Sequence, residues 1–124
     1  MTKTITPDWI AADWGTSNLR VWAMSSTGDV LAEASSDQGM GKLDPAGFEP
    51  ALLDLIGDWV DGPMTVVACG MVGARQGWVE ADYDRVPCPA ATTGFTKVAT
   101  NNADLSVHII PGIAQNAPAD VMRG

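Results

Sequence analysis

A run of polar residues, DWGTSNLR from Asp13 to Arg20, interrupts two apolar stretches and has the composition of an anion site. Gly15 lets the backbone approach a ligand closely. Successive backbone N–H groups of a tight turn can converge on an anion, and the hydroxyl groups of Thr16 and Ser17 add donors. The run therefore predicts a turn that binds phosphate.

The acid and the cation that flank this turn suggest how charge is balanced there. Asp13 repels a phosphate, but its carboxylate can bind Mg²⁺, and the metal then bridges to the phosphate oxygens. Arg20 can reach a phosphate or pair with Asp13. A hairpin whose turn happens to be polar explains the same residues without a ligand.

Apolar patterning predicts the elements that position the turn. Residues 10–14, 19–24 and 30–34 are predicted as three strands of an antiparallel meander, because short turns join them. In the second strand, Leu19, Val21 and Ala23 alternate with Arg20, Trp22 and Met24. After a glycine-rich loop, Leu52, Ile56, Trp59 and Val60 share one face of a predicted helix. Pro50 fits its first turn, and residues 62–63, Gly-Pro, are expected to end it.

The second half of the chain is expected to complete one α/β layer. Residues 64–69, MTVVAC, read as a buried strand that joins the meander in parallel through the helix crossover. Residues 70–100 read as loops and short strands, and residues 106–112 as a further buried strand. The predicted fold class is α/β with a mixed sheet.

Composition excludes several functions. The chain has 124 residues, which fits one domain, and a formal net charge of −8, which opposes binding to nucleic acid. It has no apolar run of the roughly 18 residues that span a membrane, and its first residues do not resemble a signal peptide. A cytoplasmic protein without nucleic-acid or membrane partners is expected.

The run DWGTSNLR resembles the phosphate-binding hairpin of the actin, Hsp70 and sugar-kinase superfamily, in which a D-x-G-[ST]-[ST] turn joins the first two strands of a ribonuclease-H-like domain. A closer resemblance is to the 2-dehydro-3-deoxygalactonokinases. It rests on ADWGTSNLRVW (residues 12–22), CGMVGARQGWVEADY (residues 69–83) and PGIAQNAPADVMRG (residues 111–124). The resemblance implies a ribonuclease-H-like, actin-like ATPase lobe.

The same resemblance implies an activity, the ATP-dependent phosphorylation of 2-dehydro-3-deoxy-D-galactonate at its terminal hydroxyl. Asp13 would hold Mg²⁺, and the ATP phosphates would lie against the turn and the strand after it, on Gly15, Thr16, Ser17, Asn18 and Arg20. Phosphoryl transfer requires positioning and charge neutralisation more than covalent chemistry by the protein.

The resemblance also places the keto sugar acid, beside the turn that follows residues 64–69. In related sugar kinases a glycine-rich turn at this position contacts the sugar. Arg75 is the expected partner of the substrate carboxylate through a bidentate pair. The other expected substrate contacts are Met71, Gly73, Gln76 and Trp78. Without the resemblance, Arg75 reads as a partner of a surface acid and Trp78 as a core residue.

Asp120 is the candidate general base for the attacking hydroxyl. The alternative is that Asp120 caps a helix that begins near Val121. Residues 1–124 resemble only the N-terminal lobe of a two-lobe kinase, so the C-terminal lobe is expected to be missing and the isolated chain to be inactive or nearly so. A phosphohydrolase of the same superfamily, and a non-catalytic binding domain completed by another polypeptide, are the alternatives.

Overall fold

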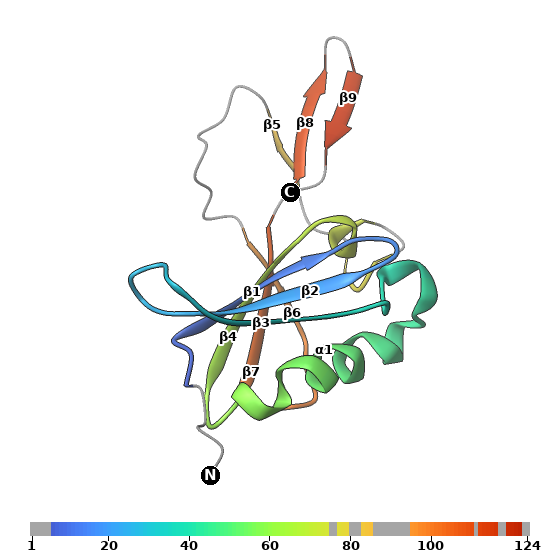
Figure 1. Ribbon diagram of the computed structural model, residues 1–124. Coiled ribbons are helices and arrows are strands. Elements are labelled where there is room, and N and C mark those ends of the chain that lie inside the picture. Colours follow the sequence, from blue (N-terminus) through green and yellow to red (C-terminus); the bar gives the residue numbers. More distant parts are fainter. Residues whose placement is uncertain are drawn as a thin grey trace.

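A six-stranded mixed sheet with an α-helix on one face forms the body of the protein (Figure 1). The computed structural model describes residues 6–74, 77–79, 83–85, 95–110, 112–116 and 119–122. The strand order is β3-β2-β1-β4-β7-β6. These strands are β1 (Trp9–Trp14), β2 (Leu19–Met24), β3 (Val30–Ser36), β4 (Met64–Cys69), β6 (Thr96–Val98) and β7 (Leu105–Ile109).

Pairing of both kinds makes the sheet mixed, as the sequence predicts. β1 pairs with β2, and β2 with β3, in antiparallel register, whereas β4 lies parallel to both β1 and β7. A second, three-stranded sheet joins β5 (Tyr83–Arg85), β8 (Gly112–Asn116) and β9 (Ala119–Met122). β5 precedes β6 in the chain, whereas β8 and β9 follow β7, and this sheet lies at the top of the view in Figure 1.

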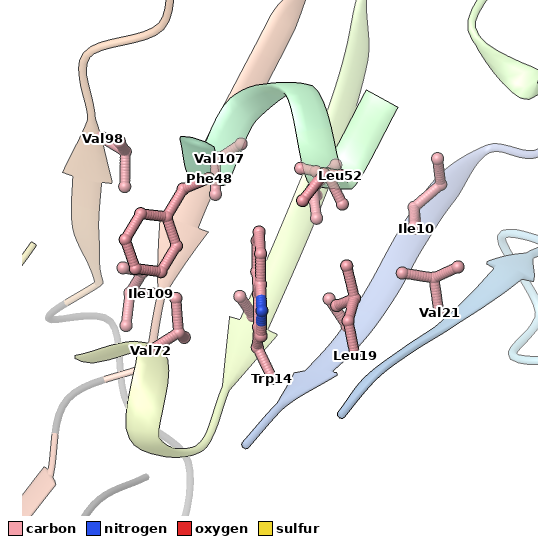
Figure 2. Close-up of a cluster of buried hydrophobic side chains, with 14 of the residues drawn as sticks. Ile10, Trp14, Leu19, Val21, Phe48, Leu52, Val72, Val98, Val107 and Ile109 are labelled. Atoms are coloured by element: carbon pink, nitrogen blue, oxygen red, sulfur yellow. The ribbon is translucent and has the colours of Figure 1, made fainter. Parts of the chain in front are cut away.

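The hydrophobic core lies between one face of the large sheet and helix α1 (Phe48–Ile56). Alternate residues of β1 and β2 point into it, so Ile10, Trp14, Leu19 and Val21 are fully buried while their neighbours face away. Figure 2 shows Trp14 between Leu19 and Val72, below Phe48. The opposite face of β1 and β2 carries the exposed Asp13 and Arg20 beside half-buried apolar residues, Trp9, Ala11, Trp22 and Met24.

The structure corrects the predicted end of the helix. The α-helix ends at Ile56, well before residues 62–63, and the chain continues as a 3-10 turn, η3 (Gly57–Trp59). Glycine has a low helix propensity, and the N–H of Val60 closes the tighter turn on the carbonyl of Gly57. Trp59 and Val60 still pack against the core, but from this turn and its end.

The predicted strand over residues 106–112 is also corrected. It runs as β7 from Leu105 to Ile109, and Gly112 begins β8 in the other sheet. Residue 111 is a proline, which has no backbone N–H with which to extend the ladder.

No helix in the described part of the chain is long and apolar enough to cross a membrane.

The helix-cap interpretation of Asp120 is wrong, because residues 119–122 form strand β9. Asp120 pairs with Gln115 of β8, and Asn116 pairs with Ala119 in the same antiparallel hairpin. Val121 is β-branched and favours this extended conformation.

A carboxylate in the first turn of α1 ties the helix to the loop before β7. The two oxygens of Glu49 accept hydrogen bonds from the backbone N–H groups of Asn101 (2.8 Å) and Asn102 (3.0 Å). The link spans more than fifty residues of sequence and fixes the N-terminal end of the helix against the loop before β7.

Replacing Glu49 by Ala leaves both N–H groups without their acceptor and removes this link. We expect Glu49→Ala to lower the free energy of unfolding by about 1–3 kcal/mol, measured by urea denaturation. The exposed Asp54→Ala on the same helix is the control and is expected to change stability by less than about 0.5 kcal/mol. An equal loss of unfolding free energy in the two variants would contradict the role given to Glu49.

Candidate functional site

The turn between β1 and β2 forms a pocket of about 290 Å³. Gly15 lies half-buried at its start, and the N–H of Gly15 donates to the carbonyl of Asn18 (3.0 Å), which closes the turn. The lining residues are Asp13, Gly15, Thr16, Ser17, Asn18 and Arg20. The structure thus brings together, in one pocket, all six residues that were predicted for the metal and the phosphates.

A second segment, residues 38–41, braces this turn from behind. The N–H of Met40 donates to the carbonyl of Gly15 (2.8 Å), and the N–H of Gly41 donates to the carbonyl of Thr16 (2.9 Å). The carbonyl of Gln38 accepts from the indole Nε1 of the buried Trp14 (2.9 Å). Residues 38–41, the bracing segment, are therefore anchored to the core through Trp14, and they fix the conformation of the β1–β2 turn.

These hydrogen bonds orient the donors of the turn. In a trans peptide the C=O of one residue and the N–H of the next point in opposite directions. Because the carbonyls of Gly15 and Thr16 point at the bracing segment, the N–H groups of Thr16 and Ser17 point away from it. Within the described residues, neither N–H, nor that of Asn18, donates to another protein group. The N–H groups of Thr16 and Ser17 are therefore available to an anion.

Gly39 is required by this packing. A Cβ built on it would fall inside the van der Waals distance of the backbone atoms of Thr16, Ser17 and Asn18. The close approach leaves no room for a side chain. The sequence alone did not predict a role for the bracing segment. The two glycines that flank Met40 in QGMG are a signal for it, because glycine allows close backbone packing.

Asp13 lies on the solvent-facing side of β1, at its carboxyl end. It is paired in register with Arg20 of β2 and with Cys69 of β4, so the three residues form a row across three strands. Burial raises the pKa of the Cys69 thiol, and the charge of the Asp13 carboxylate raises it further. The thiol is therefore kept protonated, and the carboxylate remains exposed.

The donor set at Asp13 fits a magnesium ion that is shared with phosphate. No group of three or more His, Cys, Asp or Glu residues that could hold a metal is found in the described ranges. Mg²⁺ is usually bound by one or two carboxylates together with substrate phosphates and water, so a single exposed carboxylate beside free N–H donors suits it.

The second predicted cluster begins next to Asp13, where β4 ends. Gly70 has φ +98°, and a Cβ on it would lie 2.9 Å from the carbonyl oxygen of Trp14 and 3.4 Å from Oδ1 of Asp13. The tight exit predicted at Gly70 therefore touches the end of β1. Beyond it, Met71 and Gly73 lie in the 3-10 turn η4 (Met71–Gly73), with Met71 exposed and Gly73 buried.

Trp78 packs on the aromatic core. Its ring stacks on Phe48 (centroids 5.8 Å apart, planes 12° apart) and meets Trp14 edge-on (5.7 Å). The backbone N–H of Trp78 donates to the carbonyl of Val72 (2.9 Å). These contacts fit the core alternative for Trp78, and because the side chain is half-buried its role as a substrate contact stays a prediction.

Three predicted site residues are not placed by the structure as functional groups. Arg75 and Gln76 lie outside the described residues. Asp120 is placed by its backbone alone, in β9 of the three-stranded sheet. Their roles stay predictions.

Comparison with known proteins finds a matching family model and two named relatives. Residues 13–124 match the family model described as 2-keto-3-deoxy-galactonokinase. The Rhizobium meliloti (strain 1021) protein named "Probable 2-dehydro-3-deoxygalactonokinase DgoK1" is 40% identical over 120 residues, which cover 94% of this chain and 39% of that protein. The Escherichia coli (strain K12) 2-dehydro-3-deoxygalactonokinase is 34% identical, over 97% of this chain and 40% of its own length.

A solved structure agrees with these matches. A crystal structure of a Sinorhizobium meliloti protein, provisionally named as a 2-dehydro-3-deoxygalactonokinase, superposes with a TM-score of 0.77 at 37% sequence identity. The match covers 94% of this chain and 39% of that one. The chain thus spans about two-fifths of the length of these relatives.

The packing of Gly39 generates a first prediction for this site. Gly39→Ala should force the bracing segment away from the turn and lower the free energy of unfolding by about 1–3 kcal/mol in urea denaturation. Gly57→Ala is the matched control, because a Cβ there meets nothing within 4 Å. It is expected to be neutral or stabilising by up to about 1 kcal/mol. A tolerated alanine at position 39 would show that the turn is not braced in this way.

The neighbouring positions of Asp13 and Cys69 lead to a second prediction, which concerns the reactivity of the thiol. Asp13→Asn removes a negative charge beside the thiol, so the pKa of Cys69 should fall and the thiolate fraction should rise. At pH 8 we expect Cys69 to react with iodoacetamide about two- to fivefold faster, followed by peptide mass spectrometry. Asp58→Asn, which changes the same charge in η3, should leave the rate unchanged. An unaltered rate in Asp13→Asn would mean that the carboxylate does not act on the thiol.

Proposed function

We propose that this chain, which belongs to the 2-keto-3-deoxy-galactonokinase family, supplies the magnesium and phosphate site of a sugar-acid kinase. The reaction is transfer of the terminal phosphoryl group of ATP to the terminal hydroxyl of 2-dehydro-3-deoxy-D-galactonate. The observation that carries the proposal is the pocket at the β1–β2 turn, in which a carboxylate, free N–H donors, two hydroxyls and a guanidinium line one space.

Each pocket residue has a task that its chemistry suits. The backbone N–H groups of Thr16 and Ser17, together with the two hydroxyls, donate hydrogen bonds to phosphate oxygens. Asp13 would hold the magnesium ion, and Arg20 brings a positive charge to the pocket of a protein whose formal net charge is −8. A bound magnesium ion would neutralise phosphate charge during transfer.

The acceptor is proposed to bind next to Asp13, at the turn after β4. Gly70 brings this turn into contact with the end of β1, so a molecule held there lies beside the phosphate pocket. Met71, Gly73, Gln76 and Trp78 are proposed to contact the sugar acid, and Arg75 its carboxylate. Asp120 remains the proposed acceptor of the hydroxyl proton.

The described sheet supports the proposal that residues 1–124 form a ribonuclease-H-like lobe. Three consecutive antiparallel strands are followed by a helix and by strands added in parallel. Of the six pocket residues, five are exposed and Gly15 is half-buried. The relatives are more than twice as long as this chain. We propose that a second lobe completes the cytoplasmic enzyme, and that the isolated chain has little activity because nothing closes over the phosphates.

The test joins this chain to the remaining part of the Rhizobium meliloti relative and measures ADP release with the keto acid present or absent. We expect turnover that needs the keto acid, and Asp13→Ala should lower kcat/KM at least about 100-fold, because phosphate charge is then no longer neutralised. Asp58→Ala, an exposed acid outside the pocket, is the control and should retain activity.

Two other outcomes would replace the proposal. ATP hydrolysis that ignores the keto acid but requires Asp13 would indicate a phosphohydrolase. A hybrid that is folded by circular dichroism and cooperative unfolding, yet turns over no ATP, would indicate a non-catalytic binding domain.

A further inference from the structure

Two opposite charges face each other across the β1–β2 hairpin without forming an ion pair. Asp13 and Arg20 are register partners, and side chains at such positions start only about 5 Å apart. Among the residues that the structure describes, the ion pair that does form joins Lys42 and Asp37 (3.7 Å). Another interaction must therefore hold the guanidinium of Arg20 away from the carboxylate of Asp13.

The guanidinium lies instead over the indole of Trp22, 5.2 Å from the ring centroid. Trp22 is two residues further along β2, so its side chain is on the same face of the sheet as that of Arg20. The indole is itself fixed, because its Nε1–H donates to Oε2 of Glu33 (3.1 Å), its register partner on β3. Glu33, Trp22 and Arg20 form a chain of contacts that ends at the pocket.

We infer that Trp22, fixed by Glu33, is a positioning residue that holds Arg20 at the pocket and off Asp13. The inference rests on the proposed function, since it concerns how the pocket keeps both of its charges available. An Asp13–Arg20 ion pair would occupy the carboxylate oxygens that a magnesium ion needs. It would also occupy the N–H groups that a phosphate needs.

The geometry of stacking explains why an indole suits this task. A guanidinium on a ring face uses its planar surface and leaves the N–H donors in its plane free for oxygen ligands. An ion pair with a carboxylate uses those same donors. At exposed sites the two interactions are similar in strength, so a well-oriented indole can compete with the carboxylate. The bond from Trp22 to Glu33 supplies that orientation.

The test is an NMR titration of this chain with magnesium tripolyphosphate, a method that measures weak binding. We expect Trp22→Leu to weaken binding about three- to fivefold. Trp22→Phe keeps a ring face but loses the bond to Glu33, so its loss of binding should be smaller than that of Trp22→Leu without returning to the native value. In an Arg20→Ala background, Trp22→Leu should cause no further loss, because there is no guanidinium left to position.

The control and a second readout separate positioning from general damage. Trp9→Leu removes another half-buried indole, which donates to the carbonyl of Ser25 at the other end of the hairpin, and should not change binding. The side-chain proton resonances of Arg20 should be shifted upfield by the indole in the native chain and in Trp22→Phe, but not in Trp22→Leu. This shift is measured without ligand.

The outcomes also separate this inference from the proposed function. An equal loss from Trp22→Leu with and without Arg20, or Arg20 resonances that ignore the substitution, would overturn the positioning role while Asp13→Ala and Arg20→Ala still weaken binding. If those two variants bind tripolyphosphate as the native chain does, the pocket is not the phosphate site, and both conclusions fail together.

Discussion

Two backbone hydrogen bonds, from Met40 to Gly15 and from Gly41 to Thr16, are the constraint on which the candidate site depends. They satisfy the carbonyl groups of the turn on its inner side, and peptide planarity then directs the next N–H groups outward. The constraint reaches into the core, because Trp14 anchors Gln38, and it requires a residue without a side chain at position 39. A four-residue turn alone has many conformations, whereas a braced one presents the same donors each time.

Strand geometry then distributes the remaining groups. Alternation along β1 places Trp14 in the core and Asp13 on the open face, so one strand both anchors the brace and carries the acid. Parallel pairing with β4 brings Cys69 and Gly70 to the same edge. The contacts of Trp78 with Trp14 and Phe48 connect the loop after β4 to the same aromatic cluster. The proposed phosphate and substrate clusters thus share one structural base, although they are more than fifty residues apart in sequence.

The sequence predicted those parts of the structure that local patterns determine. The strands around the turn, the parallel addition of β4 and the six residues of the pocket follow from alternation, turn chemistry and the D-x-G-T-S pattern. The contacts of the bracing segment could not be predicted, since they depend on where residues 38–41 lie once the three strands have paired. The β8–β9 hairpin was missed because its strands are short and their apolar residues do not alternate clearly. The helix ended early because a glycine at position 57 favoured a tighter turn over continued α-helix.

The most direct test of the proposed phosphate site is a crystal structure of this chain with a non-hydrolysable ATP analogue and Mn²⁺ in place of Mg²⁺. We expect an anomalous peak beside the carboxylate of Asp13, and phosphate oxygens within hydrogen-bond distance of the N–H groups of Thr16 and Ser17. Phosphates bound elsewhere, or a metal ion remote from Asp13 in crystals where the β1–β2 turn is open to solvent, would contradict it.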